Sequence, residues 1–215
     1  MSHETVTAQK HPSRATDHLL GKMWKTKSAR FNAQQRLMSR HWTSTVSTSV
    51  LACYLIAASI LQLTIPAAAT GNFGKIITSA ILITSVFLLM ITLTESAKNY
   101  PGEAERMHRS ALEIAELYNS FQALDLMTAD AQRTAYNDRY SAALKAIEVS
   151  HKDIDFLRFK IGARKDFKPS ALAYVGMLLL YVALWLSEYG LYILIVGGPL
   201  VFFLVLIVQS GAWVG

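Results

Sequence analysis

Charged side chains are missing from long stretches of this 215-residue chain, although the whole chain carries 21 Lys and Arg against 15 Asp and Glu. Residues 46–65, 76–94, 171–187 and 191–208 contain no Asp, Glu, Lys, Arg or His. An acid or base at mid-membrane marks proton-coupled transporters and intramembrane hydrolases, so its absence argues against both classes. We therefore expect apolar segments that do no chemistry of their own.

Cysteine is nearly absent as well. The single residue, Cys53, cannot form an internal disulfide, and nothing indicates an oxidising compartment. The chain also lacks a phosphate-binding glycine loop, a metalloprotease helix, a paired-cysteine metal site and a nucleophile elbow. No signal peptide is visible, because the first apolar run follows about 45 mostly polar residues. We expect no enzymatic activity, no cofactor and no metal, and a chain that is inserted into a membrane and retained.

The four apolar runs predict the architecture. Each of the first two is about 20 residues long, enough to cross a hydrocarbon core of about 30 Å, and a short turn with Lys75 as its single charged residue joins them. We interpret 46–94 as a membrane hairpin in preference to a buried hairpin of a soluble protein. The runs at 171–187 and 191–208 are separated only by Glu188-Tyr189-Gly190, which predicts a second membrane hairpin within 166–215 and four spans in total.

The distribution of basic residues predicts the topology. Eight Lys and Arg precede the first run, and twelve lie within 95–170. The positive-inside rule then places both long polar segments and both termini in the cytoplasm, with Glu188 solvated on the outer side or biasing a pore vestibule toward cations. We favour attraction to anionic lipid over nucleic-acid binding as the reason for the net charge of +6. The residues that we assign to the membrane surface are Arg30, Arg36, Arg40, Arg164, Lys165 and Lys168.

The residue pattern of the polar segments predicts helices. We expect residues 1–15 to be disordered and 16–45 to form a basic amphipathic helix, which either lies on the membrane or packs in a cytoplasmic bundle. Helical periodicity continues through 95–165 and predicts two long cytoplasmic helices, 103–126 and 129–161. The predicted fold class is therefore an all-α integral membrane protein. Two transmembrane hairpins flank a long cytoplasmic helical hairpin, and an amphipathic helix precedes them.

Polar side chains form a stripe in the first hairpin. Thr78, Ser85 and Thr92 recur every seven residues in the second run, while Ser59 and Gln62 lie near one face of the first. Such hydroxyls usually bond to carbonyls of their own helix or pack against a neighbouring helix. The alternative is that these five side chains line a water-filled conduit.

One cluster in the polar region contains residue types that can bind a metal. On a helix, Glu148, His151, Lys152 and Asp155 share a face, so a histidine between two carboxylates could contribute to a metal site. The tract has no second His and no Cys. We therefore favour ion pairing between helix neighbours over metal or catalysis.

The order of these parts resembles the SLATT domain, a two-transmembrane effector domain associated with SMODS nucleotidyltransferases and SLOG sensors. The resemblance covers about residues 20–165, within a domain whose limits we place at residues 16 and 165. It rests on a basic helix with Arg30-Phe31 and Arg36-Leu37, a Ser/Thr-rich hairpin and a late helix. The residues that this late helix carries, and that we expect to make contacts between cytoplasmic helices, are Tyr136, Tyr140, Leu144, Glu148, His151 and Asp155.

The resemblance implies an effector of a bacterial antiphage system in the inner membrane. Such a protein would form homo-oligomers and permeabilise the membrane when a nucleotide signal or a partner protein reports infection, which ends in abortive infection. A nucleotide-synthesising or sensor protein encoded nearby would be the partner. The second hairpin departs from a two-span domain and would be an extension that packs around it or aids assembly. The alternative function is a non-conducting scaffold that recruits a soluble partner through its cytoplasmic helices.

Overall fold

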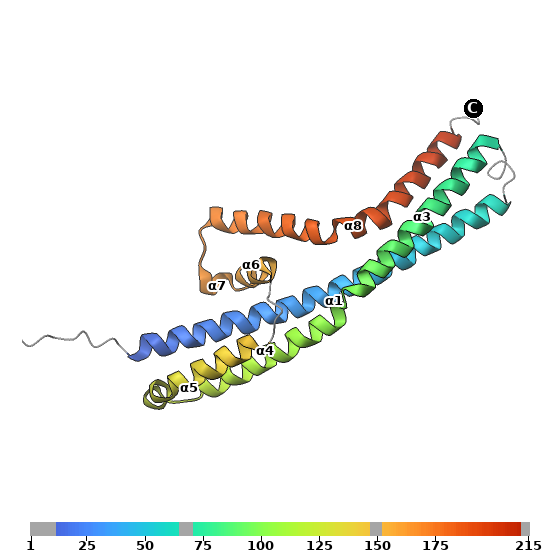
Figure 1. The fold of residues 1–215 in the computed structure, drawn as a ribbon. Helices are drawn as coiled ribbons and strands as arrows, with labels where there is room; N and C mark the ends of the chain where they lie inside the picture. The colour runs from blue at the N-terminus through green and yellow to red at the C-terminus, as the bar shows by residue number, and fades with distance from the viewer. Residues whose placement is uncertain (1–11, 65–70, 147–151, 212–215) are drawn as a thin grey trace, which may run out of the picture. The chain divides into compact units, whose positions relative to one another are not determined.

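The computed structural model describes residues 12–64, 71–146 and 152–211, and every element in them is an α-helix (Figure 1). The long helices are α1 (Pro12–Thr64), α3 (Gly71–Ala97), α4 (Tyr100–Gln122), α5 (Leu126–Lys145) and α8 (Ala171–Gly211). Two short helices, α6 (Asp153–Gly162) and α7 (Arg164–Phe167), lie between α5 and α8. The all-α class is confirmed. Segments long and apolar enough to cross a membrane lie in α1, α3 and α8.

The predicted C-terminal hairpin is wrong. Helix α8 is a single helix of 41 residues that continues without a break through Glu188-Tyr189-Gly190, where we expected a turn. The physical reason is that none of these residues forbids a helix: glycine in a helix interior costs only about 1 kcal/mol relative to alanine. Within the described chain, three apolar helices therefore replace the four predicted spans.

Two other predicted boundaries also change. Helix α1 begins at Pro12, inside the segment 1–15 that we expected to be disordered, and residues 1–11 lie outside the described chain. The predicted helix 129–161 is not continuous, because Lys152 has an extended backbone (φ −84°, ψ 162°) and starts α6 as its N-cap. Residues 147–151, with Glu148 and His151, are outside the described chain.

The helices form two compact units, which we describe separately. The first, here called the polar unit, comprises α1 up to Arg36 and residues 102–178. Its core joins α1, α4 and α5, and Met23, Ile114 and Phe121 are almost fully buried. These residues belong to apolar stripes at helical spacing, so packing the stripes together removes them from water.

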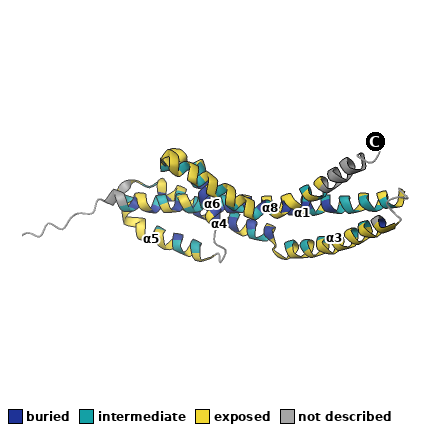
Figure 2. Ribbon diagram, turned by 90° about the horizontal axis from the view of Figure 1, so that it is seen from above, coloured by how far each residue is buried: buried dark blue, intermediate teal, exposed yellow. Residues whose placement is uncertain are grey.

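The second unit, here called the apolar unit, comprises residues 37–101 and α8 from Leu179 onward. Its small buried core consists of Leu51, Tyr189, Tyr192 and Ile195, with Leu88 and other side chains of the hairpin packed against it. Most of its remaining apolar surface is exposed, as the colouring of α3 in Figure 2 shows. The most apolar stretch of α3 contains no buried residue. A helix that is apolar on all sides yet uncovered is typical of a segment surrounded by lipid.

Candidate functional site

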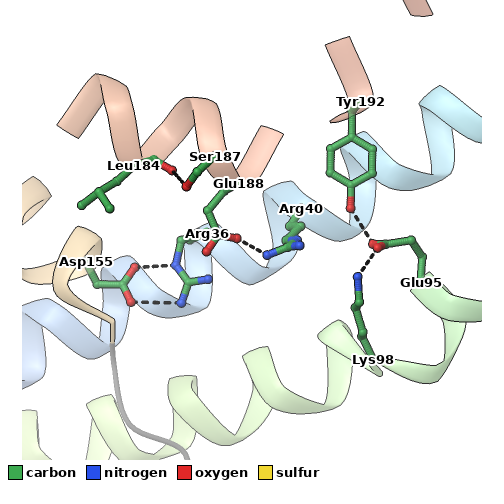
Figure 3. A network of polar contacts seen from close by, with 9 residues as sticks. All are labelled: Arg36, Arg40, Glu95, Lys98, Asp155, Leu184, Ser187, Glu188 and Tyr192. Carbon is green, nitrogen blue, oxygen red and sulfur yellow. Dashed lines mark hydrogen bonds and ion pairs between the residues drawn. The ribbon is translucent and has the colours of Figure 1, made fainter. Parts of the chain in front are cut away.

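A cluster of polar side chains joins the three helices of the apolar unit, and we call it the Arg40 cluster. Arg40 Nη1 donates to Glu188 Oε2 of α8, and the guanidinium lies 5.1 Å from the centroid of the Tyr100 ring. Glu95 at the end of α3 accepts hydrogen bonds from Tyr192 and from Lys98 (Figure 3). The cluster therefore holds two cations and two carboxylates at the place where α1 enters the hairpin and α3 leaves it.

Burial makes these contacts stronger than surface ion pairs. The Arg40, Glu95 and Glu188 side chains are 19%, 9% and 12% exposed, so water screens them only partly. Burial also raises the pKa of the Tyr100 phenol to about 12. The arrangement can fix the register of α8 against the hairpin, because a shift of one residue along α8 would separate Glu188 from its cation.

The cluster also fixes the direction of α8 within this unit. From Arg40 the chain runs along α1 to Leu51, and from Glu188 it runs along α8 to Ile195, and both end in the same core. The C-terminal part of α8 therefore lies parallel to α1. Glu188 is thus at the same end of the hairpin as Arg40, and the expectation that it lies in an outer turn is wrong. The structural reason is its ion pair with Arg40.

A second polar contact centres on Asp155 in the polar unit. Arg36 of α1 donates to both carboxylate oxygens, at 2.8 Å from Nε and 3.1 Å from Nη2 (Figure 3). Asp155 Oδ2 also accepts the backbone N–H of Lys152 at 3.0 Å, and Asn32 donates to the Asp155 carbonyl. Asp155 is 2% exposed and Arg36 is 8% exposed. The carboxylate therefore caps the start of α6 and ties it to α1 at once.

The neighbouring turns of α1 are tied to α5. Thr26 and Tyr140 share a hydrogen bond of 2.7 Å, and Arg30 Nη1 lies 3.5 Å from the carbonyl of Ala143. Arg30 is 5% exposed, and this burial lowers the pKa of its guanidinium. Arg30 and Arg36 are therefore buried inside the polar unit. We had expected both to face a membrane surface, and that expectation is wrong. The cause is that each finds an acceptor on a later helix.

The other residues expected in helix contacts are placed as follows. Tyr136 packs on Phe121, with ring centroids 4.8 Å apart, and Leu144 lies against the core of the polar unit. Of the remaining cations assigned to the membrane surface, Arg164, Lys165 and Lys168 are exposed, and the Arg164 guanidinium lies 4.4 Å from the Tyr174 ring centroid.

The predicted polar stripe forms local bonds. The hydroxyls of Ser59, Thr78, Ser85 and Thr92 each donate to a carbonyl of their own helix, at 2.7–2.9 Å. Gln62 Nε2 donates to Thr78 Oγ1 and so connects α1 to α3. Local bonding is the first of the two interpretations given for these residues. That these residues line a conduit stays a prediction.

No group of three His, Cys, Asp or Glu side chains that could hold a metal ion occurs among the described residues. Asp155, the described acid of the tract considered for metal binding, is bound by Arg36 and the Lys152 amide. The expectation of no metal stays a prediction, since Glu148 and His151 are outside that part of the chain.

The Arg40 cluster was not predicted from the sequence, although a signal for it is present there. Arg40, Glu95 and Glu188 each border an apolar run. When the runs lie side by side across a membrane, residues at borders on the same side of it lie close together. Glu188 is also the single charge in residues 169–215. A lone acid of that kind needs a cation, and Arg40 is at the matching border.

The exposed apolar helices and the polar clusters at their ends define an all-helical protein of the membrane type. The chain belongs to the SMODS and SLOG-associating 2TM effector domain family 5, whose model matches residues 13–205. This confirms the resemblance to the SLATT domain. The match extends through most of α8, so this helix is part of the family domain and not an addition to it. No curated protein and no solved structure matched the chain.

Proposed function

We propose that this protein is an effector of a bacterial antiphage system that assembles into homo-oligomers and permeabilises the inner membrane when a nucleotide signal or a partner protein triggers it. The observation that carries the proposal is the uncovered apolar surface of α3, in a chain that belongs to an effector domain family. A helix of this kind needs lipid or further copies of the chain around it. The protein needs no catalytic residue for this function.

We propose that the signal passes along helix α1. Its N-terminal part contributes Met23 to the polar core, and its C-terminal part contributes Leu51 to the apolar core. The helix is continuous from Pro12 to Thr64. A partner or nucleotide that changes the packing of the polar unit would therefore act on a helix that also forms part of the membrane hairpin.

For the conduit we propose Ser59, Gln62, Thr78, Ser85 and Thr92. Substituting Thr92→Leu or Ser85→Leu should reduce membrane depolarisation in cells in which the system is triggered, because an apolar wall raises the cost of moving an ion past it. The matched control is Thr94→Leu. Thr94 also bonds to its own helix, at 2.8 Å from the Met90 carbonyl, but it lies on another face of α3. Equal depolarisation in the stripe variants and the control, with assembly intact, would remove the conduit assignment.

A non-conducting scaffold is the second candidate, and the local hydroxyl bonds favour it. Side chains that satisfy themselves on their own helix, as Thr78 and Ser85 do, are what an anchor helix requires. In this case the polar unit would recruit a soluble protein to the membrane. Liposomes that contain the purified protein and its trigger would distinguish the two functions, since a scaffold releases neither ions nor dye.

A further inference from the structure

Helix α8 is too long for one crossing of a membrane. Its 41 residues extend over about 62 Å at about 1.5 Å per residue. The hydrocarbon core of a bilayer is about 30 Å thick, so roughly half of the helix must lie elsewhere. The question is which half crosses.

The Arg40 cluster answers it. Glu188 pairs with Arg40 at the entrance of the hairpin, and the next turns of α8 pack against the hairpin with Tyr189, Tyr192 and Ile195. The half that runs beside the hairpin is therefore the one after Glu188. Residues 189–211 extend over about 35 Å, which suits one crossing.

The half before Glu188 is then left outside the crossing, although it too is apolar. Residues 169–187 contain no charge. Leu172 is 85% exposed and Leu179 is 67% exposed, so no described part of the chain covers them. An apolar surface that is exposed in this way is not left in water, so something beyond the described residues covers it.

The residues around this half indicate a lipid surface. Arg164, Lys165 and Lys168 precede it and are exposed, and cations in this position are attracted to anionic headgroups. Tyr174 and Trp185 lie within it, and such aromatic side chains prefer the membrane–water boundary. The Ser187 hydroxyl donates to the Leu184 carbonyl at 2.8 Å, a contact that commonly bends helices, directly before the crossing half begins.

We infer that residues 171–187 of α8 lie in the anionic leaflet at the entrance side of the hairpin, at the boundary between headgroups and acyl chains, and do not cross the membrane. The leaflet thereby covers the apolar face, and α8 continues from it into the bilayer after Glu188. The inference requires insertion of the protein but not conduction, so it stands or falls separately from the proposed pore.

Depth-dependent quenching tests this inference on the full chain. In a Cys53→Ala background, single cysteines replace Leu179, Val201 or Met127 and carry an environment-sensitive fluorophore, in vesicles of phosphatidylcholine and phosphatidylglycerol. The label at Leu179 should be quenched roughly twofold more by lipids brominated near the headgroup than by lipids brominated near the chain end. Val201, 64% exposed in the crossing half, should show the reverse order, and Met127, 87% exposed on α5, should respond to aqueous iodide alone.

Three results would overturn the inference. Deep quenching at Leu179, as at Val201, would mean that this half crosses the membrane. Quenching by iodide would mean that it lies in water, and no quenching by either agent would mean that a protein surface such as a second copy covers it. A label on Leu180→Cys repeats the measurement one residue along the helix, should the first substitution disturb the protein.

Discussion

The ion pair between Arg36 and Asp155 should be among the most sensitive points of the polar unit. The substitution Arg36→Met keeps an unbranched apolar stem but leaves the carboxylate, which is 2% exposed, without its guanidinium. Removing one partner of a buried ion pair typically costs about 3–5 kcal/mol, because the remaining charge is desolvated and uncompensated. We expect the free energy of unfolding to fall by about that amount.

A double-mutant cycle separates the pair from its surroundings. Asp155→Ala should cost at least as much as Arg36→Met, since it also removes the acceptor for the Lys152 amide. The double variant should cost less than the sum of the single variants, with a coupling of about 2–3 kcal/mol. The matched control is the pair of Arg109 and Glu105 on α4, which has the same N–O distance of 2.8 Å but side chains 77% and 54% exposed. Its coupling should stay below about 0.5 kcal/mol.

The measurement is unfolding of the full chain in mixed micelles, followed by the emission of Trp24 in a background in which Trp42, Trp185 and Trp213 are replaced by Phe. This side chain contacts Phe159 of α6 at 4.8 Å and Phe167 of α7 at 6.1 Å between ring centroids, so it reports on the region that Asp155 holds. The reasoning is refuted if the two cycles give the same coupling, or if Arg36→Met unfolds at the same detergent fraction as the wild type.

Three further predictions concern other parts of the chain. Tyr140→Phe, which removes the hydrogen bond with Thr26, should lower the free energy of unfolding by about 1 kcal/mol in the same assay. Asp125 caps α5 by accepting the Thr128 amide at 2.8 Å, and hydrogen bonds from the Thr128 hydroxyl and then from this amide lower the carboxylate pKa below its ordinary 3.8. The ionised cap therefore stabilises α5 above pH 3.8, and this stability is lost as the pH falls through the lowered pKa. The protection of the Thr128 amide from exchange, relative to an unstructured amide at the same pH, should fall there in the wild type but not in Asp125→Asn. Finally, if α8 crosses once, the C-terminus lies on the opposite side from the N-terminus, so a C-terminal alkaline phosphatase fusion should be active and a fluorescent-protein fusion dark, whereas two cytoplasmic termini would give the reverse.

The sequence alone was sufficient for the helical class and for the first hairpin. Helical periodicity and uncharged length are local properties, so they are visible in α1 and α3 without knowledge of packing. The stripe with Met23 predicted one side of α1 correctly as apolar. It could not decide whether lipid or a helix covers that side, because both are apolar surroundings. The buried Ile114 and Phe121 of α4 show that a helix covers it within the polar unit.

The roles of the basic residues needed the structure. Arg30, Arg36 and Arg40 lie on a helix that enters a membrane hairpin, and the positive-inside rule treats all three alike. Which of them is buried depends on acceptors more than a hundred residues later, the Ala143 carbonyl and the Asp155 carboxylate among them. Contacts over such separations have no periodic signature, and a single sequence carries no other record of them.

The error at α8 has a physical cause that applies beyond this chain. A single acid between two apolar runs was interpreted as a turn, because an unpaired carboxylate is costly inside a membrane helix. That cost disappears when the acid lies at the membrane border and a cation from another helix meets it there, as Arg40 meets Glu188. The helix can then continue, and its two apolar halves can have different surroundings. A lone acid in an apolar stretch should therefore be compared with the cations at the borders of the other runs before a turn is assigned, since the pairing decides whether the chain crosses the membrane an even or an odd number of times.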